Sequence, residues 1–468
     1  MLKKLSLKNF KGISVLSDLE FKPITILCGT NSSGKSSILK SILLAMQSAE
    51  SQSNDSPLLF NGKYTKLGAF FDVIHNHDLK KEMSLSYTFN FLDLQEQIRK
   101  YKISRMIKDF FNIENFKDKE NAVTFSLGFK CLNSEIILSS FSISNDKVKI
   151  FLEHCKDNKY KLICNNIFTY EKRKENSGLT LETDVELMYI NSINPRIKIS
   201  AANTSSQDDF ANARYIDMTC HYSSVIFQIL LEQISYLGPL RKEPVRRYIY
   251  EEEINSIGCR GENAAYIYSK VKENKVKSFF YNTKKNTFEM NEYKFSTALN
   301  KWLSQMNIID FDNNQMKEII RLNVKSSSGV KVDISDVGFG VSQILPILIE
   351  GLRMESGQTL LLEQPEIHLH PKLQMQITDF FIAMALNNKN TIIETHSEHL
   401  IKRLVRRSLE DDSISELINI YFINKNSEFE KIIIDKHKGI INWPKDFFDQ
   451  AVEEEKEILN LVIKNRKK

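Results

Sequence analysis

The 468-residue sequence lacks several features that mark whole classes of protein. No stretch comes near the roughly 18 uninterrupted apolar residues of a membrane-spanning helix. The first residues, MLKKLSLKNFKG, are basic but include no apolar h-region, which argues against a secretory signal. The six cysteines contain no C-x-x-C pair, so scattered reduced thiols are expected rather than disulfides or a zinc site. We therefore expect a cytoplasmic protein with no membrane partner.

Charge of one sign is not in large excess either. The sequence has 64 basic and 59 acidic side chains, a difference of +5, which is too small to indicate nucleic-acid binding by itself. Internal repeats and sustained heptads are absent, so a long coiled-coil arm is not expected. Hydrophobic residues make up 42% and charged residues 26%, which is typical of a globular protein, and the length suits two or three domains.

Apolar periodicity predicts an α/β fold in which both ends of the chain contribute to one head domain. Near the start, it indicates strand, turn and strand over 3–28, a helix over 36–47 and a strand over 83–91. The last third alternates helix and strand, which favours a mostly parallel sheet. Its predicted elements are helices over 341–353, 371–387 and 397–409 and strands over 359–363, 390–394 and 418–423.

The middle of the sequence has a different pattern. It is predicted to hold a helix over 92–118, short alternating strands over 122–200, and helices over 208–235, 296–305 and 313–323. The predicted division is an N-terminal part of the head (1–91), a strand-rich and helical insertion (92–235), a linking helical region (236–325) and a C-terminal part of the head (326–468). The fold class is thus α/β, a head domain with a mixed sheet plus the strand-rich and helical insertion.

A phosphate-binding loop is the most specific motif. Residues 29–36 read GTNSSGKS and match G-x-x-x-x-G-K-[ST] between a predicted strand and a predicted helix. Two glycines let backbone N–H groups face phosphates, and the helix N-terminus adds partial positive charge. Lys35 would reach the β- and γ-phosphates of ATP, and the Ser36 hydroxyl would ligate Mg²⁺. The predicted nucleotide-binding residues here are Asn31, Ser32, Ser33, Gly34, Lys35, Ser36 and Ser37.

Acidic and histidine residues follow two later predicted strands. The first strand ends at Glu363, whose carboxylate is the predicted ligand of Mg²⁺. A proline two residues later stops the strand. The second ends at Glu394, and His396 beside it is placed to donate to a γ-phosphate. His368 and His370 could suggest a metal pair, but no third and fourth ligand is evident, and a structural role is preferred.

A glycine-rich turn lies upstream of the first of these strands. Residues 335–343 read SDVGFGVSQ and open an apolar helix, so they place backbone N–H groups at a second helix N-terminus. Because the phosphate loop already holds one set of phosphates, this second anion site would suit the ATP of a facing copy. Its predicted nucleotide-binding residues are Gly338, Gly340, Ser342 and Gln343.

Together these motifs resemble the ABC-type ATPase heads of the RecF, SMC and OLD-nuclease kind. The resemblance covers residues 1–90 and about 320–425 and rests on NFKG, NSSGKSS, VGFGVSQILPIL, EQPEIHLHP and ETHSEHL. The segments YLGPLRKEPVRRY (236–248) and NWPKDFFDQ (442–450) also resemble a bacterial ATPase subfamily found in antiphage defence operons such as Septu, PARIS, Gabija and certain retrons.

The resemblance implies a homodimer, or a higher homo-oligomer built from dimers, with two ATP molecules at its interface. Each ATP would lie between the phosphate loop of one subunit and the 338–343 turn of the other, with Lys11 near the nucleotide. It also implies an ATPase. A basic group, consisting of Arg241, Lys242, Arg246 and Arg247, fits either a contact with nucleic acid or a partner, or a salt-bridged structural turn.

One position departs from the pattern of these ATPases. The residue after the Mg²⁺-side acid is usually a glutamate that orients the attacking water, and here it is Gln364. A neutral amide can orient water but cannot accept its proton, so slow hydrolysis is expected. Glu366 or Glu394 would take over the proton. Catalysis is thus assigned to Glu363, Gln364, Glu366 and His396.

The sequence that follows the predicted ETHSEHL helix is short. It lacks the clustered acids of a metal nuclease and any HNH-like Cys/His set, and the acids of VEEEKE (452–457) have helical spacing on a solvated face. The basic end, IKNRKK, is predicted to be frayed. We therefore expect the effector, a nuclease, to be a separate polypeptide. The alternatives are a RecF-like ATPase that clamps DNA, and a nonhydrolytic scaffold in which ATP is a structural ligand.

Overall fold

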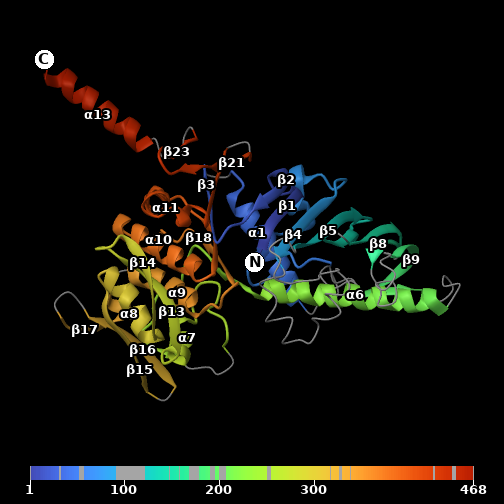
Figure 1. Cartoon of the computed structure of the whole chain (residues 1–468), viewed down its shortest axis with the longest axis horizontal. Helices are drawn as coiled ribbons and strands as arrows, with labels where there is room; N and C mark the ends of the chain where they lie inside the picture. Colours follow the sequence, from blue (N-terminus) through green and yellow to red (C-terminus); the bar gives the residue numbers. More distant parts are fainter. Residues whose placement is uncertain are drawn as a thin grey trace. The chain divides into compact units, whose positions relative to one another are not determined.

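The structure is a computed structural model, and it forms two compact units, each built from separated parts of the chain (Figure 1). The first unit contains residues 1–21, 36–236 and 355–359, and the second contains 22–35, 237–354 and 360–468. The structure describes all residues except 1, 31–32, 52–56, 91–121, 147, 158, 168–178, 190–195, 200–206, 250–253, 317, 326–328, 338, 425–426, 445–449 and 467–468.

A nine-stranded sheet forms the body of the first unit. Its order is β10-β9-β8-β7-β6-β5-β4-β1-β2, and all pairings that are resolved in it are antiparallel. The strands are β1 (Leu2–Phe10), β2 (Ile13–Glu20), β4 (Met83–Asn90), β5 (Ala122–Leu132), β6 (Glu135–Ser144), β7 (Lys149–Lys156), β8 (Lys159–Ile167), β9 (Leu179–Tyr189) and β10 (Arg196–Ile199). The helical segments are α1 (Lys35–Glu50), α2 (Phe70–Val73), η1 (His75–His77) and α6 (Gln207–Glu232).

Alternating apolar residues explain how this sheet buries one face. In β4, Met83, Leu85 and Tyr87 are buried, with half-buried serines between them. Phe227 of α6 stacks on Phe125 of β5 with ring centroids 4.6 Å apart, and it also lies 5.7 Å from Tyr87. The Tyr87 hydroxyl donates to the carbonyl of Ser41 in α1. Both helices therefore pack on the apolar face of the sheet.

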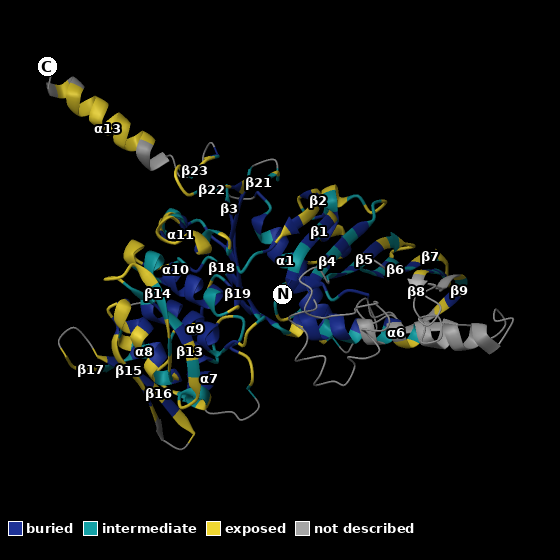
Figure 2. Cartoon of the chain, viewed as in Figure 1, coloured by how far each residue is buried: buried dark blue, intermediate teal, exposed yellow. Residues whose placement is uncertain are grey.

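A mixed sheet is the centre of the second unit. Its order is β11-β18-β19-β3-β20-β21; β3 is parallel to both β19 and β20, whereas β21 is antiparallel to β20. Its strands are β3 (Ile24–Gly29), β11 (Ile234–Leu237), β18 (Thr359–Glu363), β19 (Asn390–Glu394), β20 (Ile418–Ile423) and β21 (Phe429–Ile432). Strands β19 and β20 are buried throughout, as expected for parallel strands covered on both faces. Figure 2 shows this buried interior in dark blue.

Helices and a smaller sheet complete the second unit. The helical segments are α7 (Ala264–Val271), α8 (Phe295–Gln305), η4 (Ile334–Asp336), α9 (Phe339–Arg353), α10 (Pro371–Leu386), α11 (Glu398–Glu410), α12 (Asp412–Ser415) and α13 (Gln450–Arg466). The remaining strands are β12 (Tyr248–Ile249), β13 (Lys275–Asn282), β14 (Thr287–Lys294), β15 (Ile309–Met316), β16 (Ile319–Lys325), β17 (Lys331–Asp333), β22 (Ile434–Asp435) and β23 (Gly439–Ile440). Among the described residues, no helix is both long and apolar enough to cross a bilayer.

A buried ionic cluster ties α10, α11 and β13 together. Asp379 of α10 accepts hydrogen bonds from Arg403 and Arg407 of α11, at 2.6 and 2.7 Å. Arg407, 1% exposed, also pairs with Glu410, and its guanidinium carbon lies 3.2 Å from the ring centroid of Tyr281 in β13. Buried charges are tolerated when they are paired in this way, and removing one partner would leave the others uncompensated.

The structure confirms the α/β class and corrects parts of the predicted elements. The six elements predicted over 341–423 are present as α9, β18, α10, β19, α11 and β20, and the helix predicted over 296–305 is α8. The helix predicted over 313–323 is wrong, because this segment spans strands β15 and β16. In β16, Ile320, Leu322 and Val324 are buried in alternation, which is the period of a strand.

Smaller corrections concern element ends. The helix predicted over 208–235 ends at Glu232, because Ile234 already belongs to β11 at the edge of the mixed sheet. The basic end of the chain is not frayed up to Arg466, where α13 ends. The helix predicted over 92–118 lies outside the described residues.

Candidate functional site

The phosphate loop joins the central strand of the mixed sheet to helix α1. Strand β3 ends at Gly29, whose φ is +140°, and a Cβ there would lie 2.1 Å from the backbone oxygen of Ile423 in β20. Gly34, just before α1, has φ +102°. Only glycine tolerates both the close approach and these backbone angles. Both glycines of the motif are therefore required by the local fold.

Lys35 lies inside this loop and is 4% exposed. Its Nζ donates to the carbonyl oxygens of Thr30 at 2.6 Å and Gly29 at 3.2 Å. Burial lowers the pKa of Lys35, and the carboxylate of Glu394 opposes that shift. The ammonium thus lies in a polar, water-poor loop next to one acid.

Two hydroxyls of the loop suit an anionic ligand. The Oγ1 of Thr30 and the Oγ of Ser33 are buried and have no hydrogen-bond partner among the described residues. Buried polar atoms are almost always paired, so such oxygens point to a ligand or ordered water. Asn31 and Ser32, also predicted to bind nucleotide, lie outside the described residues. The loop therefore fits the phosphates of ATP in the part that the structure describes.

The acidic tips of β18 and β19 lie against each other. The backbone N–H of Gln364 donates to the carbonyl oxygen of Glu394 at 2.8 Å, and Gln364 has φ +45°. Glu363 is the last residue of β18 and is half-buried. The left-handed conformation at Gln364 turns the chain sharply after the strand. The predicted acid and its neighbouring amide are therefore held at the same sheet edge as the end of β3 and Lys35.

Glu366 and His396 meet at this edge. One carboxylate oxygen of Glu366 accepts from the backbone N–H of His396 at 2.6 Å. Burial raises the pKa of Glu366, although the hydrogen bond from His396 opposes the shift. Burial and the charge of Lys35 lower the pKa of His396, so its ring is neutral at pH 7. A neutral imidazole keeps one N–H that can donate to an anion.

Arg241 is a member of this site that the sequence left ambiguous. It is 3% exposed, and its guanidinium donates to the carbonyl oxygens of Glu363 and Gln364, both at 3.1 Å. It also lies close enough to Glu366 to lower the pKa of that carboxyl. Arg241 is therefore part of the structural turn and holds the tip of β18. Lys242, Arg246 and Arg247 are exposed, with Arg246 paired to Asp336.

Replacing Arg241 with alanine is expected to lower ATP turnover about tenfold with little change in nucleotide affinity. The loss removes the guanidinium donor from two part-buried carbonyls, which costs about 1 kcal/mol and lets the tip of β18 move. Turnover and nucleotide binding, measured on the same sample below its melting temperature, would check this. Arg247→Ala, an exposed change in the same segment, should have no effect. Equal losses in both variants, or a loss of affinity alone, would contradict the assignment.

The glycine-rich turn leads into α9. Ser342 and Gln343 are 6% and 3% exposed, and the Oε1 of Gln343 is buried with no hydrogen-bond partner among the described residues. A Cβ on Gly340 would meet only ordinary contacts, the nearest at 3.7 Å, so packing within the chain does not require this glycine. Gly338 lies outside the described residues. The turn thus has the small residue and the polar atom that a second anion site needs.

Three predicted site residues belong to the first unit. Ser36 and the buried Ser37 occupy the first turn of α1. Lys11 follows β1 with φ +50°; its N–H donates to the carbonyl of Val73 at 2.6 Å. Burial and the charge of Lys40 on α1 lower the pKa of Lys11. Lys11 therefore lies beside α1, and its proximity to a nucleotide stays a prediction.

The two histidines that follow β18 are candidates for a metal pair, and the structure gives one of them a structural role. His370 caps α10 by accepting the backbone N–H of Lys372 at 3.3 Å, and Pro371 follows it as the first helical residue. His368 is exposed with φ +61°. Nowhere in the described part of the chain do three or more His, Cys, Asp or Glu side chains form a metal cluster. A Mg²⁺ ion held by Ser36, Glu363 and phosphate oxygens would not need one.

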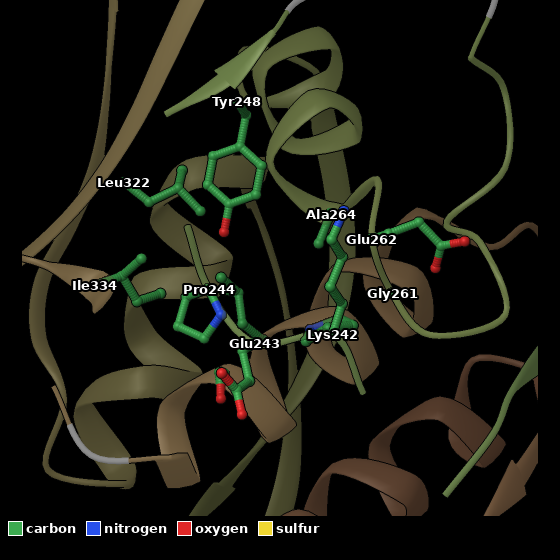
Figure 3. Close-up of a pocket in the computed structure, with 12 residues that line it drawn as sticks. Lys242, Glu243, Pro244, Tyr248, Gly261, Glu262, Ala264, Leu322 and Ile334 are labelled. Atoms are coloured by element: carbon green, nitrogen blue, oxygen red, sulfur yellow. The ribbon is translucent and has the colours of Figure 1, made fainter. Parts of the chain in front are cut away.

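A small pocket lies between the 242–248 segment and α9 (Figure 3). Its interior is about 20 Å³, which is room for a single water molecule. Tyr248, Pro244 and Ser342 are among the residues that line it. Gly261 also lines it and lies close to α9, because a Cβ there would lie 2.5 Å from Pro346. The pocket is too small for a nucleotide; it shows that the 242–248 segment packs against the helix that begins at the glycine-rich turn.

Comparisons with known proteins identify a family over most of the chain. A family model described as "AAA ATPase domain" matches residues 1–401, and one described as "Protein of unknown function (DUF3696)" matches residues 415–458. No curated protein matches the chain. The SMC head domain from Thermotoga maritima is 11% identical, with a TM-score of 0.41, and the match covers 92% of this chain and 99% of that one.

Two further solved structures are similar. A structure titled SmcHead bound to the C-winged helix domain of ScpA is 13% identical with a TM-score of 0.36, covering 93% of this chain and 98% of that one. An Smc head domain with an extended coiled coil, bound to the C-terminal domain of ScpA and derived from Pyrococcus furiosus, is 11% identical with a TM-score of 0.36, covering 98% and 99%. With TM-scores this low, nothing further rests on these likenesses.

Proposed function

The chain belongs to the AAA ATPase domain family, and from this premise we propose that it binds Mg²⁺-ATP at the sheet edge formed by β3, β18 and β19 and hydrolyses it slowly. One observation carries the proposal: a buried lysine, Lys35, lies in a phosphate loop with the acidic tips of two strands beside it. A positive side chain next to carboxylates at a strand edge is what a metal-bound triphosphate requires.

Each residue has a part in this proposal. Lys35 would leave the carbonyls of Gly29 and Thr30 and bind the β- and γ-phosphates. Mg²⁺ would be held by Ser36 and Glu363, and when bound it neutralises charge on the phosphates. The remaining roles belong to side chains at the strand tips, with Gln364 orienting the attacking water and His396 donating to the γ-phosphate.

Proton transfer is the weak step of this site. The amide of Gln364 cannot take a proton from water. Glu366, with its raised pKa, and Glu394, beside Lys35, are the acids that lie close enough to the strand tips to do so. Because Glu394 is buried, and Glu366 is half-buried and already accepts from the N–H of His396, slow turnover is expected. A slowly hydrolysing site would keep ATP bound for a long time, which suits a switch.

We further propose that ATP joins two copies, each phosphate loop facing the glycine-rich turn of the other copy. The unpartnered Oε1 of Gln343 and the space at Gly340 support a second anion site at α9. Because Gly340 has room for a larger residue, Gly340→Asp should keep the fold while its carboxylate repels the phosphates of the facing copy. Neither Gly340→Asp nor Lys35→Ala should hydrolyse ATP alone.

Mixing these two variants is expected to restore activity. A mixed dimer has one site with both defects and one intact site, so random pairing should return about a quarter of wild-type turnover. Phosphate release by equal amounts of the two chains measures this. Lys35→Ala mixed with Ser36→Ala, two defects in the same half, is the control and should stay inactive. No recovery in the first mixture would exclude the shared site.

The biological role that the motif resemblance supports is an ATPase and sensor subunit of a bacterial antiphage defence complex. In this proposal the dimer acts as a scaffold that controls a separate effector, a nuclease. The support lies in the YLGPLRKEPVRRY and NWPKDFFDQ segments. Expression with a nuclease encoded by a neighbouring gene, followed by phage challenge, tests it. Protection that survives Lys35→Ala would contradict ATP control of the effector.

Two alternative functions are each favoured by one observation. Exposed Lys242, Arg246 and Arg247 could bind the phosphates of DNA, as in a RecF-like ATPase; binding that falls steeply with salt concentration would support this. Gln364 also allows a nonhydrolytic scaffold. ATP-dependent assembly without phosphate release would favour that second alternative.

A further inference from the structure

Helix α13 has an apolar surface that nothing in its own chain covers, as far as the described residues show. Every described side chain from Glu453 to Ile463 is exposed, and Figure 2 draws them in yellow. Five of them are large and apolar, with exposed fractions between 43% and 60%: Ile458, Leu459, Leu461, Val462 and Ile463. So many exposed apolar residues on adjacent turns mark an interaction surface.

Two of these residues, Leu459 and Val462, share one stripe of the helix with three other positions. Positions 452, 455, 459, 462 and 466 follow one another at intervals of three, four, three and four residues along the helix. That spacing puts them on one stripe, the pattern of a helix that pairs with another helix. Leu459 and Val462 occupy the middle of the stripe. Within the stripe, Glu455 precedes this apolar pair and Arg466 follows it.

The charges of α13 are arranged with opposite signs about its apolar centre. Acidic residues precede it, at 453–455 and 457, with Lys456 among them, and basic residues follow it within the helix, at 464 and 466. About the midpoint between Asn460 and Leu461, Glu455 is the counterpart of Arg466, and Glu457 is the counterpart of Lys464. A helix with this pattern is complementary to itself when a second copy runs in the opposite direction.

We propose that α13 pairs antiparallel with α13 of a second copy of this chain. Leu459 would face Val462 of the partner subunit across a two-fold axis, and Glu455 would face Arg466 of the partner subunit. A parallel pairing would instead put Glu455 against its own copy, so like charges select the antiparallel arrangement. This contact involves no residue of the nucleotide site, and it does not depend on ATP.

The mass of the full chain in solution tests the proposal. A helix pair of this length binds weakly, so the measurement is sedimentation equilibrium at protein concentrations up to about 100 μM. At that concentration, a dimer with a micromolar dissociation constant is almost fully formed. Lys35→Ala chains without nucleotide remove any dimer joined by ATP. These chains should form dimers, and adding Leu459→Asp should weaken the dimer at least about tenfold, because it puts a charge in the apolar centre. A monomer at every concentration, or a dimer that Leu459→Asp leaves intact, would overturn the proposal.

Charge-reversal variants distinguish pairing with a second copy from binding to another partner. Glu455→Arg alone should weaken the dimer, since it faces Arg466 of the partner subunit, and Arg466→Glu alone should do the same. The double variant should dimerise again, and so should an equimolar mixture of the two single variants. Glu453→Arg makes the same charge change on the far side of the helix from the stripe and should have no effect. Failure of both rescues while each single variant is weakened would rule out the antiparallel self-pairing.

A membrane surface is the competing occupant. Sedimentation with vesicles of phosphatidylglycerol and phosphatidylcholine reports it for the same Lys35→Ala chain. Vesicle binding that Leu459→Asp abolishes, by a chain that stays monomeric in solution, would assign α13 to lipid and overturn self-pairing. Dimers that do not sediment with vesicles are the expected result.

Discussion

Replacing Lys35 with alanine is expected to lower ATP turnover at least about 100-fold, because removing one preorganised donor to a charged transition state has an effect of this size. The effect should be large here because Lys35 is 4% exposed and lies in a loop where water screens its charge poorly. ATP affinity should fall as well, since the ammonium binds phosphates in the ground state too. Phosphate release and binding of a fluorescent ATP analogue measure the two losses separately.

The fold should survive this change. Among the described residues, Lys35 Nζ donates to two carbonyls of its own loop, and Gly29 and Gly34 set the loop conformation. Lys372→Ala, an exposed lysine at the start of α10, is the matched control and should behave as wild type. Full turnover in the Lys35→Ala chain would remove the phosphate loop from the proposed site. Equal losses in both variants would point to a nonspecific charge effect.

Replacing Gln364 with glutamate is expected to raise turnover about 10–100-fold, because general base catalysis contributes on this scale. Gln364 already sits next to Glu363, with its backbone fixed by the carbonyl of Glu394 and by Arg241. Glutamate has the same length and fits the same backbone, so the change adds a proton acceptor without moving the strand tip. Single-turnover hydrolysis of bound ATP measures the step directly.

The added carboxylate should work only with an intact site. Gln364→Glu combined with Lys35→Ala should be inactive, which separates a gain in catalysis from a contaminating ATPase. Glu366→Gln and Glu394→Gln in the wild-type background show which acid accepts the proton when Gln364 is present. A folded Gln364→Glu chain with unchanged or lower turnover would show that the proton is already taken efficiently elsewhere.

The α/β head could be predicted because its signals are local. Strands such as Ile24–Gly29 and Ile418–Ile423 are buried on both faces, so they are short continuous apolar runs bounded by glycine or polar residues. The phosphate loop fixes its chemistry in eight consecutive residues, and the two glycines carry backbone angles that few other residues adopt. The fold class and the sheet edge on which the candidate site lies follow from these runs.

Other parts depend on residues distant in sequence. Residues 313–323 contain enough polar residues to fit a helix pattern, and only pairing between β15 and β16 decides for strands. The role of Arg241 depends on carbonyls 122 and 123 residues later in the chain. The predicted division at residues 91, 235 and 325 stays a prediction, since each compact unit combines separated segments.

The buried cluster around Asp379 has a mechanical consequence. Helix α11 begins at Glu398, directly after Ser397, whose hydroxyl caps the helix and whose neighbour is His396. Because two arginines of α11 pair with Asp379 of α10, we expect α10 and α11 to move together as one lever. Arg407 extends that lever to Tyr281 in the β13–β14 hairpin. A small shift of His396 as the γ-phosphate leaves would thus be carried to the hairpin, far along the chain from the loop that binds the nucleotide.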